Sequence, residues 1–395
     1  MIFLGVLFRK EQEKDIIALS KNGVSNAVNL FQWNVIEGIV GFVDNKLHIV
    51  NALPVGTYPR NYKKIILNDI KWDYMGADCY ELGGINLPFL KQFVRSLKAK
   101  HAVKKLVKTE KEIIVYSAYM PYLKAAYKLP RDVKLTVIIT DLPEYYDLAR
   151  VGRIRRFLRK CQNKMVYKYL TRADRFVLLT EQMKYPLNVG NRPYIVVEGI
   201  TDFAPNQIEA NDDKKSEEKI IFYSGSLNYQ FGIKTLLDAF LSINDDNARL
   251  WICGAGEAAD EIKQISKTDS RIVYHGFLPL DKVAELRSKS DVLVNPRPNE
   301  GEYTKYSFPS KTMEYMASGI PVVMYKLHGI PDEYDDYLIY VKNNSAEDLR
   351  DAILSVLDMT YEERKVFGQK ARQFVLSSKI KKAQGERIAN FIKTT

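Results

Sequence analysis

The sequence predicts two α/β domains, each a doubly wound parallel sheet. Short apolar runs rich in β-branched residues alternate with helical patterns along nearly the whole chain, which is typical of parallel strands joined by crossover helices. The runs IIFYSG, RLWICGAG, DVLVNP and IPVVMY are apolar without alternation, as expected for strands covered on both faces. The length of 395 residues favours two domains over one or four.

In the first half, the apolar runs and helical patterns alternate from the first residues onward. The expected strands are Ile2–Phe8, Leu47–Asn51, Lys64–Leu67, Ile113–Ser117, Leu135–Thr140, Arg175–Leu179 and Tyr194–Val197. The expected helices are Ser25–Glu37, Pro88–Val107 and Ile154–Leu170. The opening MIFLGVLFRK has no basic region before its apolar run and no small-residue cleavage site, so it is interpreted as a first strand and not as a signal peptide.

The second half repeats the alternation. Its expected strands are Lys219–Tyr223, Leu250–Cys253, Arg271–Tyr274, Asp291–Val294, Pro321–Met324 and Leu338–Val341. Its expected helices are Ile233–Leu241, Asp281–Ser288, Lys311–Ala317, Ala346–Asp358 and Tyr361–Leu376. Residues 202–218 are polar, charged and almost without large aliphatic side chains, which predicts a linker between domains 1–201 and 219–395, with the last helix free to pack back on the first domain. Ligands of such sheets bind at the carboxyl ends of the strands, so chemistry is expected in a cleft between the two domains.

Charge and cysteine content narrow the function classes. Lys and Arg number 59 against 48 Asp and Glu, a net charge of +11 that favours a polyanionic partner such as nucleic acid, an anionic membrane or a phosphorylated substrate. No apolar window reaches the ~18 residues of a membrane span. The chain has three cysteines, Cys79, Cys161 and Cys253, which are far apart and form no C-x-x-C motif. An odd number of scattered cysteines is expected for a reduced cytosolic chain with no structural zinc.

The segment NPRPNEGEYTKYSFPSKTMEYMASGIPVV (295–323) is the most informative. It predicts a strand, a polar loop and a helix that starts near Ser307 and Pro309 and ends at Gly319. A helix N-terminus favours anions, and the segment adds cations beside it, which makes a diphosphate the expected guest. The residues expected to hold it are Arg297, Lys305, Ser310 and Lys311, with Glu314 accepting hydrogen bonds from a sugar or ribose diol and Glu302 near the donor sugar. The alternative interpretation is a solvated loop and a surface helix.

KYSFPSKTMEYMASGIPVV resembles the donor-binding helix of family 4 glycosyltransferases, particularly members that assemble bacterial surface polysaccharides. FYSGSLNYQFGIKTLLDAF, LWICGAGE and IVYHGFLPLDKVAELRSKSDVLVNP resemble other parts of that family's donor domain, and the first half resembles its acceptor domain. The resemblance implies the GT-B fold of two Rossmann-like domains facing a cleft. It also implies a nucleotide-sugar donor, no metal, and retention of anomeric configuration.

The sequence departs from the family pattern at several positions. The first of the family's two glutamates would fall at Tyr306, and the Arg and Lys that clamp the diphosphate are replaced by Ser226 and Phe231. The strand-end histidine of many members is replaced by Thr140, followed by Asp141. The positive charge is therefore expected to come from the 295–323 segment.

Three glycine turns and one carboxylate complete the candidate site. Gly225 with Ser226 opens a crossover that a diphosphate can approach, and Gly254 and Gly256 can admit a base or ribose. In each case ordinary turn packing is the alternative, and Ala259 breaks the dinucleotide pattern G-x-G-x-x-G. Two further residues are expected at the acceptor side: Asp141, orienting the acceptor or capping a turn, and Gly23 in the loop after the first strand.

Two basic stretches lie in the first half. Residues 148–173 hold nine basic residues and no acid, and residues 91–111 hold eight basic residues and one acid. Basic amphipathic helices are typical of anionic membrane surfaces, and the alternative is a solvated face of a packed helix. We therefore expect a cytoplasmic protein, peripheral on the inner face of the cell membrane.

The sequence thus predicts a glycosyltransferase that moves a sugar from a nucleotide-diphosphate donor, a UDP-sugar above others, to a glycan or lipid-linked acceptor in bacterial capsule, exopolysaccharide or surface-polysaccharide synthesis. No cofactor, metal or nucleic acid is expected, and the sequence leaves the oligomeric state open. The alternatives are a nucleotide-sugar epimerase of the same fold and a non-catalytic partner of another transferase.

Overall fold

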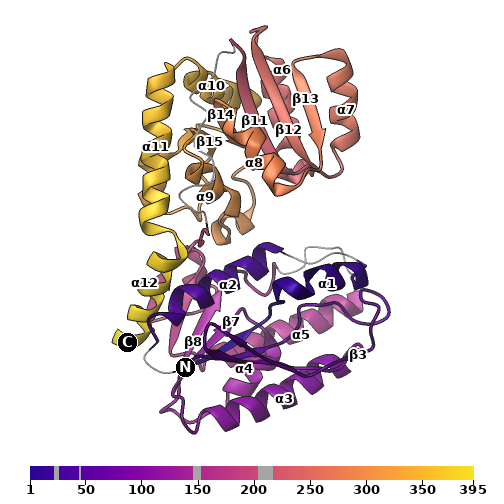
Figure 1. Ribbon diagram of the computed structural model, residues 1–395, viewed down its shortest axis with the longest axis vertical. Coiled ribbons are helices and arrows are strands. Elements are labelled where there is room, and N and C mark those ends of the chain that lie inside the picture. The colour runs from indigo at the N-terminus through magenta and orange to yellow at the C-terminus, as the bar shows by residue number, and fades with distance from the viewer. Residues whose placement is uncertain (22–25, 44–45, 146–152, 203–216) are drawn as a thin grey trace. The chain divides into compact units, whose positions relative to one another are not determined.

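The computed structural model describes residues 1–21, 26–43, 46–145, 153–202 and 217–395 (Figure 1). The chain divides into two compact units, 1–200 with 381–395, and 201–380. Each unit contains a mainly parallel sheet with helices on both faces. The predicted fold class of two doubly wound α/β domains is therefore confirmed.

The N-terminal unit is built on an eight-stranded sheet in the order β10-β9-β8-β7-β1-β2-β5-β4, in which only β4 is antiparallel to its neighbour. Its strands are β1 (Ile2–Gly5), β2 (His48–Asn51), β4 (Ile70–Tyr74), β5 (Ala77–Glu81), β7 (Glu112–Tyr116), β8 (Lys134–Ile139), β9 (Arg175–Leu178) and β10 (Tyr194–Val196), beside a small pair β3 (Ile66–Leu67) and β6 (Gly84–Ile85). Its helices are α1 (Glu13–Leu19), α2 (Asn26–Val40), α3 (Leu90–Leu106), α4 (Met120–Ala126), α5 (Arg153–Leu170) and α12 (Lys381–Thr394).

Helices α2 and α12 cover one face of this sheet. Alternate strand residues such as Phe3, Ile49 and Ile114 share a core with the apolar faces of these two helices. The two helices approach closely where Gly38 meets Gly385, because a Cβ on Gly385 would lie 2.1 Å from the Gly38 carbonyl carbon. Helix α4 lies between α3 and α5 on the other face.

Strand β1 is shorter than the predicted Ile2–Phe8. Beyond Gly5, three successive backbone amides donate to side chains and not to backbone carbonyl oxygens of a neighbouring strand. Their acceptors are Gln32 Oε1 for Val6, Asn51 Oδ1 for Leu7 and Asn29 Oδ1 for Phe8. The chain therefore leaves the sheet at this point without losing hydrogen bonds.

The C-terminal unit has a six-stranded parallel sheet in the order β13-β12-β11-β14-β15-β16. Its strands are β11 (Lys219–Ser226), β12 (Ala248–Ala255), β13 (Ile272–Gly276), β14 (Val292–Asn295), β15 (Val322–Tyr325) and β16 (Ile339–Val341). Its helices are α6 (Ile233–Leu241), α7 (Ala259–Thr268), α8 (Leu280–Ser288), α9 (Ser310–Ala317), α10 (Ala346–Leu357) and α11 (Tyr361–Ser378). The strand order equals the 3-2-1-4-5-6 order of nucleotide-binding sheets, and it reverses between β11 and β14.

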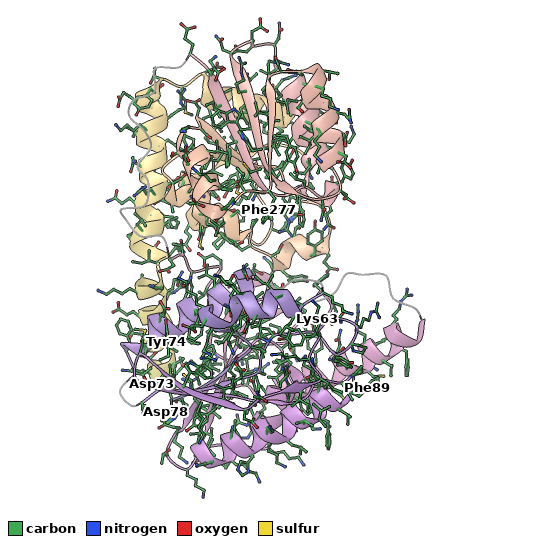
Figure 2. All side chains as sticks on the ribbon, turned by 45° about the vertical axis from the view of Figure 1, so that its right-hand side comes forward. Lys63, Asp73, Tyr74, Asp78, Phe89 and Phe277 are labelled. Atoms are coloured by element: carbon green, nitrogen blue, oxygen red, sulfur yellow. The ribbon has the colours of Figure 1, made fainter. Side chains whose placement is uncertain are left out.

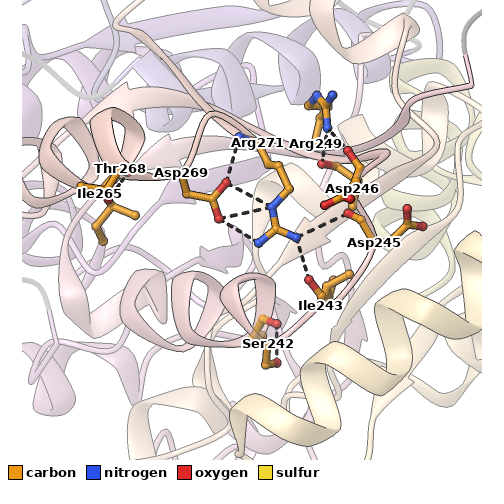
Figure 3. Close-up of polar contacts among 11 residues, drawn as sticks. Ser242, Ile243, Asp245, Asp246, Arg249, Ile265, Thr268, Asp269 and Arg271 are labelled. Atoms are coloured by element: carbon orange, nitrogen blue, oxygen red, sulfur yellow. Dashed lines mark hydrogen bonds and ion pairs between the residues drawn. The ribbon is translucent and has the colours of Figure 1, made fainter.

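The amino ends of these strands are held by arginines (Figure 3). The Arg271 guanidinium makes a double hydrogen bond to Asp269 and donates to the Ile243 carbonyl oxygen at 2.7 Å. It thereby ties the start of β13 to the turn before β12. These polar side chains stabilise the amino edge, so ligand-binding groups are expected at the opposite, carboxyl edge of the sheet.

Candidate functional site

The carboxyl ends of β11 and β14 bring predicted site residues to the reversal point of the C-terminal sheet. These two strands pair in parallel, so Gly225 and Ser226 at the end of β11 lie at the same edge as Arg297, which follows β14. In sheets of this topology, ligands bind outside the carboxyl ends at the reversal point.

Lys311, the second residue of α9, lies directly against the end of β11. Its Nζ donates to the Ser224 carbonyl oxygen at 2.5 Å, and a Cβ on Gly225 would lie only 2.0 Å from this Nζ. Gly225 is therefore required for Lys311 to take this position. Burial lowers the pKa of Lys311, and the nearby Glu314 carboxylate opposes the shift. The Tyr315 hydroxyl accepts from the Ser224 amide at 3.0 Å and fixes the same strand end.

Arg297 is held by aromatic rings. Its guanidinium carbon lies 5.8 Å from the ring centroid of Phe231 and 5.2 Å from that of Tyr303, and Nη2 donates to Ser307 Oγ at 3.2 Å. The Nε atom is buried and has no hydrogen-bond acceptor within the described ranges. Stacking thus fixes a cation whose hydrogen-bonding capacity is incompletely used, as an anion site requires.

This arrangement places Arg297 over Phe231, the position where the family pattern has a clamp lysine. The close contact depends on Gly232, whose backbone is left-handed (φ 82°) and whose Cβ, if present, would lie 1.9 Å from the Pro296 carbonyl oxygen. The loop after β14 can therefore lie against the loop after β11. Ser307, predicted near a helix start, lies outside α9 and accepts from Arg297; Pro309 is the N-cap residue.

Glu314 is exposed on α9, one turn after Lys311. An arginine that the sequence analysis did not single out, Arg287 of α8, lies within electrostatic range of it: burial lowers the pKa of Arg287, and Glu314 and Tyr315 oppose the shift. Arg287 is a single arginine in an ordinary amphipathic helix, so no local pattern marks it.

Gly254 and Gly256 lie where the end of β12 meets the end of β11. A Cβ on Gly254 would lie 1.8 Å from the Gly225 carbonyl oxygen, and one on Gly256 would lie 2.6 Å from the Leu227 carbonyl carbon. Both have positive φ, 145° and 159°. Packing of neighbouring strand ends therefore accounts for both glycines.

The remaining predicted residues lie further out. Glu302 and Lys305 are exposed in a 3-10 helix (Glu302–Tyr306), and Ser310 is exposed at the first position of α9.

In the N-terminal unit, Asp141 follows β8. Its side chain reaches solvent, yet the surrounding protein desolvates it and raises the pKa to about 6, opposed by a 3.4 Å hydrogen bond from the Thr140 hydroxyl. Gly23 lies outside the described residues.

Among the described residues, no group of three or more His, Cys, Asp or Glu side chains is arranged to hold a metal ion. Within the same ranges, none of the helices has the length and apolarity to cross a membrane.

Residues 206–374 match the family model described as "Glycosyl transferases group 1". This match covers less than half of the chain, and it shows that residues 206–374 are similar to that family. A glycosyltransferase of Methanocaldococcus jannaschii is 31% identical over 137 residues, which are 33% of this chain. That alignment spans about a third of the relative, 34% of its length.

Solved structures match over the entire chain. Sucrose-phosphate synthase from Thermosynechococcus elongatus superposes with a TM-score of 0.67 at 15% identity, covering 100% of this chain and 99% of that one. Anabaena HepE in complex with UDP gives 0.64 at 12% identity, covering 100% of both. A lipopolysaccharide outer core galactosyltransferase gives 0.63 at 14% identity, covering 100% and 99%. These likenesses show the GT-B fold.

Proposed function

We propose that the chain is a glycosyltransferase that moves a sugar from a nucleotide-diphosphate sugar to a glycan or lipid-linked acceptor, with retention of configuration. The observation that carries the proposal is the pair of cations, Arg297 and Lys311, at the reversal point of a sheet with nucleotide-binding strand order. The match of residues 206–374 to the group 1 family model, and a solved structure of the same fold that holds UDP, support a UDP-sugar as donor. The proposed role is bacterial capsule, exopolysaccharide or surface-polysaccharide synthesis, as the resemblance implies.

The proposed chemistry rests on charge. When the glycosidic bond to the donor breaks, negative charge grows on the diphosphate, and preorganised cations stabilise it more than they stabilise bound donor. Arg297 and Lys311 fill this role in the proposal, with Lys305 and Ser310 as outer contacts. Glu314 binds the ribose diol, Glu302 lies near the donor sugar, and Asp141 orients the acceptor. No metal or other cofactor is part of this scheme.

A donor panel tests the proposal directly. We expect one of the UDP, GDP or dTDP sugars to raise the melting temperature, since a ligand at 100 times its dissociation constant stabilises the folded state by about 2.7 kcal/mol. The stabilising sugar should then be transferred to an acceptor. Donor consumption without any acceptor would instead indicate an epimerase, and absence of stabilisation by every nucleotide sugar would contradict the proposal.

Glu314→Gln should raise the dissociation constant of the donor about 10- to 100-fold. A charge-assisted hydrogen bond contributes ~1.5–3 kcal/mol, and glutamine preserves the shape of the side chain. Calorimetric titration with the nucleoside diphosphate measures the change. Glu362→Gln is the matched control, because Glu362 is also exposed but begins α11, whose Arg364 pairs with Asp291 at the amino edge of the sheet. Equal affinity of the Glu314→Gln variant and the wild type would remove Glu314 from the ribose contact.

Activity should fall at acid pH if the Asp141 carboxylate orients the acceptor. Its raised pKa of about 6 means that the ionised form dominates only above pH 6. At pH 5 about a tenth is ionised, so kcat/KM should be about tenfold below its plateau at neutral pH. The Asp141→Asn variant should have low activity and lack this acid limb. A wild-type profile that is flat between pH 5 and 7 would contradict the role.

The raised pKa of Asp141 has the opposite effect on folding stability: activity should rise with pH, whereas the stability of the folded state should fall. Between the usual pKa of about 4 and the folded value of about 6, the folded state binds more protons than the unfolded state, so the contribution of Asp141 to stability falls as pH rises. At pH 7 the melting temperature of Asp141→Asn should therefore exceed that of the wild type. At pH 4 this difference should be smaller.

We also propose that the protein acts as a peripheral protein on the inner face of the cytoplasmic membrane. Support comes from α3 and from α5, whose exposed surface includes Arg156, Lys160 and Lys164. Each Lys or Arg near an anionic leaflet is worth about 1 kcal/mol, so several together suffice for reversible attachment.

A further inference from the structure

The N-terminal unit has large apolar side chains on its surface where α3 begins. Ile66 and Ile85 are cross-strand partners in the β3–β6 pair, and β6 contacts α3. Along α3, Phe89, Phe93 and Leu97 recur every four residues, which places them on one side of the helix. We call these five residues the apolar edge; their exposed fractions are 65% for Ile66, 43% for Ile85, 84% for Phe89, 57% for Phe93 and 54% for Leu97. Large apolar side chains that gather on adjacent elements of a surface in this way are typical of an interaction site.

The most exposed member of the apolar edge, Phe89, also has an unfavourable backbone conformation. It precedes the first residue of α3 with φ 64° and ψ −48°, and its side chain makes no capping hydrogen bond. Bulky residues rarely adopt positive φ, and such strain persists where a function requires it. Since the ring is almost fully exposed (Figure 2), packing within the chain does not explain its position.

Cations follow the apolar edge along α3. Lys100, Lys104 and Lys105 are exposed on the same helix, and residues 91–109 contain no acid. Helix α5, on the other side of α4, also exposes the apolar Phe157 and Leu158, with Arg156 before them and lysines after them. On α3, apolar side chains in the first turns with cations behind them match the boundary between acyl chains and anionic head groups.

We propose that the apolar edge inserts into the interfacial layer of an anionic lipid bilayer while the lysines of α3 contact the head groups. The inference rests on the membrane association proposed above and names the residues that enter the lipid. A lipid surface fits better than a second copy of this chain, because a symmetric pairing would bring like-charged α3 helices together.

Depth-dependent quenching tests insertion. Phe89→Trp places an indole in the apolar edge, and Phe277→Trp is the matched control, because Phe277 is 82% exposed but belongs to the other unit (Figure 2). With vesicles of phosphatidylcholine and phosphatidylglycerol carrying brominated acyl chains, we expect quenching of the Phe89→Trp indole beyond that of wild-type protein. We expect none beyond wild type for Phe277→Trp. Equal quenching of the two variants would overturn the proposal.

Binding measurements separate insertion from charge attraction. Phe89→Asn with Phe93→Ser removes two rings and keeps every charge, and asparagine tolerates positive φ. Sedimentation with the same vesicles should show at least ~10-fold weaker binding at all salt concentrations, whereas Phe277→Ser binds like wild type. Unchanged binding of the double variant would overturn the proposal, as would a concentration-dependent wild-type dimer that the double variant cannot form. These assays contain no donor, so their failure leaves the proposed sugar transfer untouched, and failure of donor binding leaves lipid insertion untouched.

Discussion

Arg297→Ala and Lys311→Ala are each expected to lower kcat about 100- to 1,000-fold while donor affinity changes little. Removing one preorganised group that stabilises developing charge typically costs ~2.7–4 kcal/mol in the transition state. A group that interacts more strongly with the transition state than with the ground state affects kcat more than KM. Steady-state kinetics with the donor found in the panel, compared with calorimetric donor affinity, measures both quantities.

Controls separate catalysis from folding in these variants. Lys311 also bonds the Ser224 carbonyl oxygen, so Lys311→Met, which keeps the length of the side chain, should be compared with Lys311→Ala by melting temperature. Lys305→Ala should have a smaller effect, because Lys305 is exposed in the 3-10 helix before α9. If both Arg297→Ala and Lys311→Ala retain near wild-type kcat, other residues stabilise the charge and the proposed catalysis is wrong.

A rescue experiment tests the position of Arg297. Because its guanidinium stacks on Phe231, a lysine at position 231 would place an ammonium near the same point. We expect Phe231→Lys, with or without Ser226→Arg, to recover part of the kcat lost in Arg297→Ala. In the wild-type background the same lysine should lower activity, because it replaces the aromatic support with a like charge.

The sequence predicts the parts of the fold that depend on local pattern. All six strands of the C-terminal sheet are predicted, four of them from continuous apolar runs, and Gly319, with φ 78°, follows the last turn of α9 as predicted. The hairpin β4–β5 was missed, because IKWDY and ADCYE mix charged and aromatic residues and lack the long apolar runs of the central strands. The seven-residue helices α1 and α4 are too short to give a helical period.

The candidate site also contains some features that local sequence predicts and others that only the fold creates. The cations of the 295–323 segment are visible in sequence because they cluster beside a helix start. The stacking of Arg297 on Phe231, and the dependence of Lys311 on Gly225, arise from pairs 66 and 86 positions apart, and only strand order brings them together. Likewise, the exposure of Phe89 follows from a backbone conformation that no local pattern specifies.

Gly232→Ala is expected to lower the stability of the C-terminal unit by about 3 kcal/mol and to displace Arg297. Two costs add: a non-glycine residue in the left-handed region costs ~1–2 kcal/mol, and overpacking costs ~1–3 kcal/mol. The overpacking arises because the new Cβ would lie 1.9 Å from the Pro296 carbonyl oxygen, one residue before Arg297. Urea unfolding followed by Trp251 fluorescence, with Trp33 and Trp72 replaced by phenylalanine, reports on this unit.

Gly276→Ala measures the cost of a non-glycine residue in the left-handed region without overpacking. Gly276 also has positive φ, 71°, but nothing lies within 4 Å of its Cβ position. Gly276→Ala should therefore lower the free energy of unfolding by only ~1–2 kcal/mol. Gly232→Ala should lower it further, by the ~1–3 kcal/mol cost of overpacking. Because the displaced Pro296 carries Arg297 with it, only Gly232→Ala should also reduce kcat under conditions where the variant is fully folded. Equal stability losses in the two variants, with unchanged kcat, would show that the loop after β14 does not depend on Gly232 for its position.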